Sequence, residues 1–575
     1  MKNLLRYLSD YKKECIIAPL FKMLEAILEL AVPLVIAQMI DKGIKDSDTD
    51  SIIIRFVMLI ILAATGLGVS CIAQYYAAKA ATGFARGLRH DLFEHILAFN
   101  YSTIDSVGTS TMITRMTSDV NILQNGVNMF LRLFLRSPFI VAGAMIMAFT
   151  IDVRSALIFV LVIASLAVTV SVIMKINIPL LGAAQRKLDD VLCLVRENLS
   201  GARVVRAFSL EDSQIRDFED TNADLTDIML RSGRISGLMN PLTYVIVNLA
   251  VVLLIFTDRI QVNEGILTTG QVVALYNYMS QILLELVKFA NLIVIMNRAL
   301  ASADRINDIF AIPCDTRSFA DTGIADTDGE PVVEFRNVSL RYHEDADDAV
   351  SDISFKIHKG ETFGIIGGTG AGKTTIANLI PAFYTATGGK VLVCGRDVNE
   401  TDPAVLRRFA GTVMQKSVLF EGTIRDNLKF GNTNATDDDL ESAARWAVCD
   451  DFIAERGGLD GRVEAGGRNY SGGQKQRLSI ARTLAASPRL LILDDASSAL
   501  DYMTDRKLRS NIAQLPFNPT VIIIAQRTVS VMDCDNILVL DDGAMVGFGT
   551  HEELLESCPV YREIYDSQFG EQEGA

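Results

Sequence analysis

The chain has 575 residues, of which 50% are hydrophobic, and its formal net charge is −15 at pH 7. This composition is too apolar for a purely water-soluble protein, and its 21% of charged residues is too high for a purely membrane-embedded one. The acidic balance argues against nucleic acid as a partner, because phosphate backbones are bound by basic surfaces. The eight cysteines form no Cys-x-x-Cys pair, which favours reduced thiols over disulfides or a zinc site.

Long apolar runs in the N-terminal half are sufficient for helices of ~20 residues that cross a bilayer. No run near the start has the short apolar core of a signal peptide, and residues 1–13 predict an interfacial amphipathic helix instead. We predict an all-α membrane domain whose six spans lie at residues 15–40, 52–78, 131–150, 155–175, 238–256 and 271–297.

The distribution of basic residues predicts the orientation of these spans. The long connections, residues 79–130 and 175–237, hold 13 Lys and Arg residues, whereas the short connections hold four. Because basic residues favour the cytoplasmic side, we expect the long connections and both termini to be cytoplasmic. Helical periodicity in residues 80–97 and 181–207 predicts that the membrane helices extend into the cytoplasm.

Near Pro331 the pattern changes to short β-like runs that alternate with helical segments, which predicts a wound α/β domain. A stretch rich in Asp, Thr and Gly precedes this change and predicts a linker. We therefore expect a transmembrane domain with long cytoplasmic loops at residues 1–310, a linker at 311–330 and an α/β domain at 331–575.

A glycine-rich segment follows an apolar strand and opens a helical run at Thr375, as a phosphate-binding loop requires. Its residues are Gly367, Gly368, Thr369, Gly370, Ala371, Gly372, Lys373 and Thr374. Such glycines let backbone amides approach phosphates, the lysine reaches the β- and γ-phosphates, and the threonine hydroxyl holds Mg²⁺. The segment predicts binding of ATP and Mg²⁺.

Further motifs follow in an order that argues against a chance glycine-rich turn. Tyr342 could stack on adenine or simply pack against a strand, and Gln415 ends a strand-like run where its amide could contact Mg²⁺ or the attacking water. A second anion cradle precedes a helix, and a buried strand ends in two acids, the first of which suits Mg²⁺. These residues are Ser471, Gly472, Gly473 and Gln474, then Asp494 and Asp495, followed by Asp501.

Together the motifs resemble the ATP-binding cassette (ABC) family over essentially the whole chain, and residues 113–119 and 197–208 resemble loops of its exporters. The resemblance implies a P-loop nucleotide-binding domain that works as a head-to-tail pair. Each ATP then lies between one chain's phosphate loop and the other's Ser-Gly-Gly-Gln segment. It also implies that loop tips near residues 99–105 and 206–213 transmit closure, and that the membrane is a bacterial plasma membrane.

Two positions depart from the family pattern. Asp495 stands where the family has glutamate, and Gln526 stands where it has histidine. Aspartate is one methylene shorter, and glutamine cannot exchange a proton near neutral pH, so nucleotide binding should survive while hydrolysis slows. Tyr470 replaces a common leucine, but Ser471 and its neighbours are retained.

This combination resembles the degenerate-site subunit of heterodimeric bacterial multidrug exporters. The hypothesis is that this chain's own site is slow, and that a second half-transporter supplies the glutamate and histidine of a fast site. A homodimer with adequate substitutions is the alternative. Three other functions are alternatives: a nucleotide-gated channel, a regulatory membrane ATPase and an importer.

Charged residues interrupt two of the predicted spans. Lys22, Glu25 and Glu29 share one helical face of the first span, and Glu285 and Lys288 repeat the arrangement in the sixth. Charges near the middle of a bilayer are costly, so this face should turn toward protein or water. It predicts either a polar cavity wall for a small amphiphilic substrate or ion pairs between helices.

Overall fold

The computed structural model describes residues 2–314, 324, 330–342 and 346–569. These residues form two compact units. The membrane unit contains residues 1–97 and 109–313, and the nucleotide unit contains residues 98–108 together with 314–575. Most of the linker predicted at 311–330 lies outside the described residues. The short segment 98–108 therefore belongs with the nucleotide unit although the membrane unit surrounds it in sequence.

Within the described residues of the membrane unit, six helical stretches are long and apolar enough to span a bilayer. They comprise residues Leu4–Ile44, Thr49–Leu97, Thr109–Ile151, Val153–Ser200, Glu211–Asn263 and Thr269–Ala311. Each of the six predicted spans falls inside one of them. The helices that build these stretches are α1 (Lys12–Gln38), α2 (Thr49–Leu97), α4 (Thr109–Thr114), α5 (Val120–Leu133), α6 (Arg136–Ile151), α7 (Val153–Ser200), α9 (Glu211–Gly237), α10 (Met239–Asn263) and α11 (Thr269–Ala311).

The N-terminal segment differs in detail from the prediction. Residues Lys2–Tyr11 form a 3₁₀ helix, η1, and the α-helical geometry begins only at Lys12. Tyr11 and Tyr7 of η1 lie against Gly83 and Gly87 of α2: a side chain at Gly83 would collide with the Tyr11 ring, and one at Gly87 would be in tight contact with Tyr7 at 3.1 Å. The glycines thus create the surface on which η1 packs.

The third predicted span is not one continuous helix. A turn at residues 134–135 separates α5 from α6. Pro138 explains the break, because a proline has no amide hydrogen to donate to the carbonyl group four residues earlier, at Phe134. The turn places Arg136 in the first turn of α6, inside the stretch that is apolar enough to span the bilayer.

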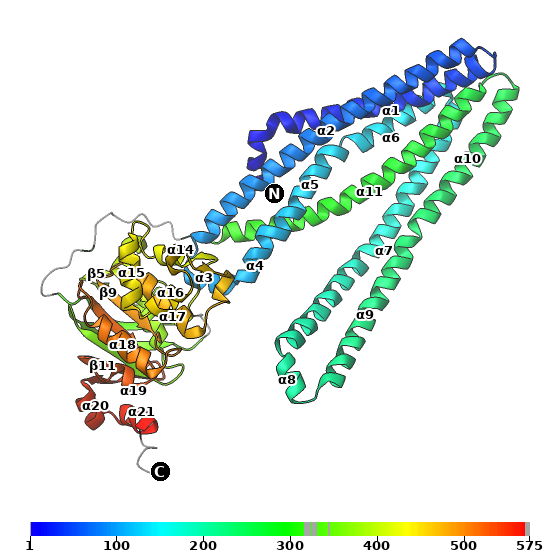
Figure 1. Cartoon of the computed structure of the whole chain (residues 1–575). Coiled ribbons are helices and arrows are strands. Elements are labelled where there is room, and N and C mark those ends of the chain that lie inside the picture. Colours follow the sequence, from blue (N-terminus) through cyan, green and yellow to red (C-terminus); the bar gives the residue numbers. More distant parts are fainter. Residues whose placement is uncertain (1, 315–323, 325–329, 343–345, 570–575) are drawn as a thin grey trace. The chain divides into compact units, whose positions relative to one another are not determined.

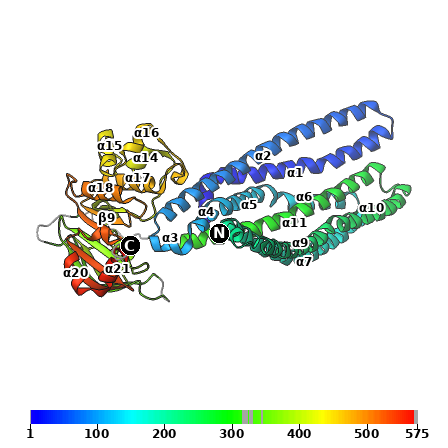
Figure 2. The same cartoon turned by 60° about the horizontal axis from the view of Figure 1, so that its bottom comes forward.

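The long connections are helical, as the periodicity predicted. Helix α2 continues to Leu97, and α7 continues to Ser200 before the short helix α8 (Ala202–Ala207) leads into α9. Figures 1 and 2 show α7 and α9 side by side, and α1 alongside α2. A core of alanines and large apolar residues, including Ala144, Phe159 and Tyr278, joins α1, α6, α7, α10 and α11.

The nucleotide unit contains two main sheets. The larger has the order β12-β11-β3-β10-β9-β6, in which β11, β3, β10, β9 and β6 are parallel, and the smaller antiparallel sheet has the order β2-β1-β4-β5. The strands are β1 (Val333–Leu340), β2 (Val350–Ile357), β3 (Thr362–Gly367), β4 (Gly388–Val393), β5 (Arg396–Asp397), β6 (Ala410–Val413), β9 (Leu490–Asp494), β10 (Thr520–Ile524), β11 (Asn536–Asp541) and β12 (Ala544–Gly549); β7 (Gly422–Thr423) and β8 (Arg462–Val463) form a separate pair.

Helices complete the unit on both sides of the parallel sheet (Figure 1). One core packs the two sheets and α12 together, and a second core packs α14 to α18 against β6, β9 and β10. The helices are α3 (Tyr101–Val107), α12 (Lys373–Leu379), α13 (Pro403–Phe409), α14 (Ile424–Lys429), α15 (Asp437–Trp446), α16 (Asp450–Glu455), α17 (Gly472–Leu484), α18 (Tyr502–Ile512), α19 (Thr528–Val531), α20 (His551–Ser557) and α21 (Pro559–Phe569). Parallel strands that end at one edge bring β3, β9, β10 and β6 to a common site.

Candidate nucleotide site

The phosphate-binding loop joins β3 to α12. Gly372 has a φ of +91°, and a side chain there would lie 2.6 Å from the carbonyl oxygen of Ala349, so only glycine fits. The Lys373 ammonium group donates to the carbonyl oxygens of Gly367, at 2.8 Å, and Gly368, at 2.5 Å. Burial lowers the pKa of Lys373. An anion in the loop would favour the charged form of this buried lysine.

Two acids lie at the end of β9, which is separated from β3 by β10 in the sheet. Asp494, at the end of β9, is buried and accepts a hydrogen bond of 3.1 Å from the Thr374 hydroxyl. Burial raises the pKa of Asp494 to about 6, and the neighbouring charge of Asp495 adds to the effect. Asp495 itself adopts a left-handed backbone conformation with a φ of +49°.

The oxygen donors at this edge fit a magnesium ion. Thr374 offers a hydroxyl oxygen, Asp494 a carboxylate and Gln415 an amide oxygen, and Mg²⁺ prefers oxygen ligands. A divalent cation would also offset the cost of burying the Asp494 carboxylate. The Gln415 amide nitrogen donates to the Asp495 carboxylate at 3.3 Å, since β6 and β9 are neighbouring strands.

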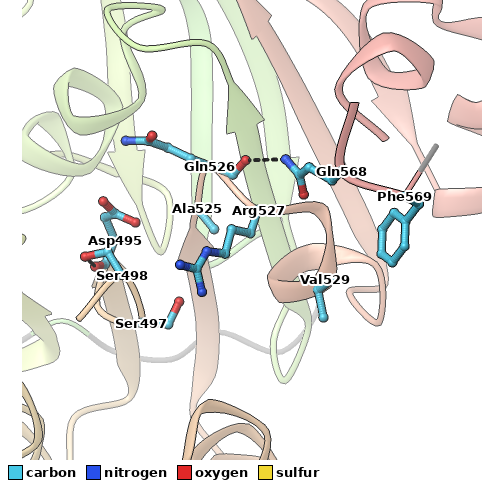
Figure 3. A pocket seen from close by; sticks show the side chains of 9 residues that line it. All are labelled: Asp495, Ser497, Ser498, Ala525, Gln526, Arg527, Val529, Gln568 and Phe569. Atoms are coloured by element: carbon cyan, nitrogen blue, oxygen red, sulfur yellow. Dashed lines mark hydrogen bonds between the residues drawn. The ribbon is translucent and has the colours of Figure 1, made fainter. Parts of the chain in front are cut away.

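Asp495 and Gln526 line the same cavity, which has a volume of about 550 Å³. Figure 3 shows the Gln526 side chain above Asp495 in that view, with Ser497, Ser498 and Arg527 below them along the same cavity. Gln526 directly follows Ala525 at the end of β10 and is exposed. The two substitutions singled out in the sequence are therefore neighbours in space.

Gln568 also lines this cavity, although no sequence motif pointed to it. Its amide nitrogen donates to the carbonyl oxygen of Gln526 at 3.0 Å (Figure 3). It lies on α21, far along the chain from the motifs, and no sequence pattern marks it.

The Ser-Gly-Gly-Gln segment forms the start of α17. The Ser471 hydroxyl accepts from the Gln474 amide at 3.3 Å, and the Gln474 side chain accepts from the Ser471 amide at 3.0 Å, which is a capping box. Tyr470 is buried, and its hydroxyl donates to the carbonyl oxygen of Arg462. The tyrosine thus serves as a core residue and leaves Ser471 and the glycines exposed or half-buried. Asp501 caps α18 by accepting from the amide of Thr504.

The predicted adenine-stacking residue, Tyr342, follows β1 and is 40% exposed. Its hydroxyl lies 3.0 Å from the Thr375 hydroxyl, and its ring makes an edge contact with Tyr384 at 5.0 Å. The Tyr384 hydroxyl donates to Asp105 of α3, and Tyr101 of α3 stacks on Phe383 at 4.4 Å. An aromatic cluster thus connects segment 98–108 with the side chain expected to bind adenine.

The charged residues of the membrane unit form an ion-pair network. Lys22 lies 2.6 Å from Glu25, and Lys288 lies 2.8 Å from Glu285. The central member is Arg136, which was not predicted from the sequence and whose guanidinium group lies 2.6 Å from both Glu29 and Glu285. Ion pairs between helices, one of the two arrangements expected from the sequence, are therefore present.

This network is electrically balanced, because it contains three carboxylates, from Glu25, Glu29 and Glu285, and three cations, from Lys22, Arg136 and Lys288. Arg136 and Glu285 are buried, whereas the Glu29 and Lys288 side chains are 40% and 46% exposed. The exposed members are those that could meet a substrate.

The fold and site together define a half-transporter, in which a six-span membrane unit is joined to an α/β ATP-binding unit. Comparisons with known proteins agree. The ABC transporter transmembrane region family matches residues 15–286, and the ABC transporter family matches residues 350–498. The uncharacterized ABC transporter ATP-binding protein YfiB of Bacillus subtilis is 33% identical over 99% of both chains.

Two further proteins are similar over nearly the whole length. YgaD of Bacillus subtilis, provisionally named a multidrug export ATP-binding/permease protein, is 28% identical over 99% of both chains. The solved structure of a bacterial Atm1-family ABC exporter with ATP bound has the same fold, with a TM-score of 0.81, 24% identity and coverage of 97% of this chain and 98% of that one. This chain belongs to the ABC transporter family, and its architecture is that of an exporter half-transporter.

Proposed function

We propose that this chain is one half of a heterodimeric exporter, and that its own phosphate loop holds ATP and Mg²⁺ in a slowly hydrolysing site. The observation that carries the proposal is that Asp495 and Gln526 face the same cavity. Both departures from the family pattern then act on a single nucleotide, whereas the residues that bind it are intact.

The position of Asp495 supports slow hydrolysis. Its carboxylate accepts from the Gln415 amide, so part of its hydrogen-bonding capacity is directed within the chain. A base must reach the water it activates, and a carboxylate that stops about 1 Å short loses about a hundredfold in rate. Gln526 can hydrogen-bond a phosphate but cannot take up or release its proton.

The Ser-Gly-Gly-Gln segment supports a second, faster site. Ser471 and its glycines sit at the start of a 13-residue helix, where backbone amides and the helix dipole favour an anion. The family pairs such a segment with the phosphate loop of another chain. A partner with glutamate and histidine would therefore gain a complete site across the interface.

The membrane unit supports a small amphiphilic substrate. The balanced ion pairs favour no net charge, while the half-exposed Glu29 and Lys288 offer a polar contact of each sign. We propose that closure of the ATP units moves such a substrate from the cytoplasmic side of a bacterial plasma membrane to the outside. Both termini and the ATP unit are cytoplasmic in this proposal.

Two variants of the full chain, copurified with its partner in lipid nanodiscs, test the asymmetry. Ser471→Ala removes a group from the partner's fast site, so steady-state ATPase activity should fall strongly. Asp494→Asn weakens Mg²⁺ binding at this chain's slow site, and the activity should fall much less. Equal losses from the two variants, or vigorous activity of the chain alone, would instead indicate a homodimer.

Transport itself is measured separately, in inside-out vesicles. ATP-dependent uptake of a dye against its gradient is expected for an exporter. Flux that only dissipates a gradient would indicate a channel gated by nucleotide.

A further inference from the structure

Helix α21 packs behind the ends of β3 and β10, two of the four strands that carry the nucleotide site. A small core joins Tyr561 of α21 to Ile366, Ala525 and Val531. Ile366 directly precedes the phosphate loop, and Ala525 directly precedes Gln526. Tyr561 is fully buried, and its hydroxyl lies 2.6 Å from His551 Nδ1, which anchors the start of α21.

From this anchored helix one side chain reaches the Gln526 segment. The Gln568 carbonyl oxygen accepts from both the amide and the hydroxyl of Thr528, at 2.8 and 2.7 Å. Its amide nitrogen donates to the carbonyl oxygen of Gln526 at 3.0 Å (Figure 3). The three bonds bracket Arg527 and hold the backbone on both sides of it.

We call these three hydrogen bonds of Gln568 the clamp. Glutamine suits it because its side chain has both an acceptor and a donor. Its carbonyl oxygen has two lone pairs, and both have a donor here, while one amide hydrogen meets a carbonyl oxygen. Glutamate could keep the bonds to Thr528 but could not donate to Gln526. Methionine has a similar length and could make none of the three bonds.

We propose that Gln568 is a positioning residue for the nucleotide site, which fixes the Gln526 segment at the end of β10. This role rests on the proposed function of Gln526 at the bound nucleotide. Without the clamp, the backbone between β10 and the buried residue Val531 would lose three hydrogen bonds, and the Gln526 side chain would be held less closely in position. Small displacements of groups at a reacting centre are costly in rate, whereas the affinity for ATP depends mainly on the phosphate loop, which, within the described part of the chain, forms no hydrogen bond with Gln568.

Three variants of the full chain test the proposal in lipid nanodiscs, in complex with a partner whose catalytic acid is disabled so that only this chain's site cleaves ATP: Gln568→Met, Gln568→Glu and the control Ser567→Ala. Ser567 lies on the same helix, and its hydroxyl donates to the carbonyl oxygen of Ile564 within that helix. The rate constant for single-turnover cleavage of γ-phosphate-labelled ATP should fall about tenfold in Gln568→Met and less in Gln568→Glu. The Kd for ATP and the melting temperature should stay close to those of the control.

Hydrogen–deuterium exchange provides a readout independent of hydrolysis. The Thr528 amide should exchange faster in Gln568→Met, because it loses its acceptor, and should stay protected in Gln568→Glu. Unchanged exchange in Gln568→Met would overturn the clamp. Faster exchange with an unchanged cleavage rate would overturn the positioning role, as would a parallel loss of ATP affinity and thermal stability.

The two proposals fail in distinguishable ways. If the chain's own site cleaves no ATP even before substitution, the proposed slow hydrolysis is wrong. The exchange of Thr528 with and without bound ATP then decides the clamp, which requires the Gln568-dependent protection in both states.

Discussion

Replacing Asp495 by glutamate should restore hydrolysis at this chain's own site. The carboxylate lies at the end of β9, and its backbone is held by a 2.9 Å hydrogen bond from the Asp495 amide to the carbonyl oxygen of Ile524. Since the backbone is fixed, one added methylene carries the carboxylate about 1 Å further into the cavity, and the cleavage rate should rise by up to about a hundredfold. That factor corresponds to about 2.7 kcal/mol in activation free energy.

The assay is single-turnover cleavage of labelled ATP in the full complex, with the partner's catalytic acid disabled so that only this site contributes. Asp352→Glu is the matched control, because Asp352 also has a left-handed backbone, with a φ of +51°, and its side chain accepts from Asn337 on a neighbouring strand. If the rate rises equally in both variants, or in neither while ATP still binds, then the length of the side chain at position 495 does not limit cleavage. Adding Gln526→His should raise the rate further.

Three other perturbations have outcomes that follow from the structure. Arg136→Met removes one cationic partner of the buried Glu285 and should lower the free energy of unfolding by about 3–5 kcal/mol. Glu29→Gln changes a side chain that is 40% exposed and should lower it by about 1 kcal/mol or less. Denaturation in detergent measures both free energies. Because the pKa of Asp494 is raised to about 6, the Mg²⁺ affinity measured by titration should fall about tenfold for each pH unit below 6. The metal-free protein should instead become thermally more stable as the pH falls from about 6 toward the ordinary carboxyl pKa, because the folded state then binds more protons than the unfolded state. A flat pH profile would contradict the raised pKa of Asp494. Gly372→Ala should abolish binding of a fluorescent ATP analogue, since the new methyl group would overlap the carbonyl oxygen of Ala349; retention of binding would show that the loop can relax.

The sequence determined most of the local structure. Apolar run length is enough to predict membrane spans, because a bilayer imposes a minimum number of residues. The phosphate loop was equally readable, since Gly372, Lys373 and Thr374 act through backbone geometry and contacts only a few residues apart in the chain. The α/β pattern followed from strand and helix periodicity in the same way.

Contacts between distant residues were decided only by the tertiary structure. Arg136 was not identified from the sequence, because its partners come from α1 and α11, more than a hundred residues away in each direction. Gln568 could not be recognised either, because a glutamine on an amphipathic helix is ordinary until the helix packs beside Gln526.

The same limit applies to segment 98–108, which follows the chain order of the membrane unit but packs with the nucleotide unit. The sequence could suggest that this tip transmits closure only by resemblance to a family. The pairing of Asp105 with Tyr384 depends on which surfaces meet after folding. Periodicity and motifs record what a residue does for its own element, whereas its long-range partners are fixed by packing, and packing is set by the whole chain at once.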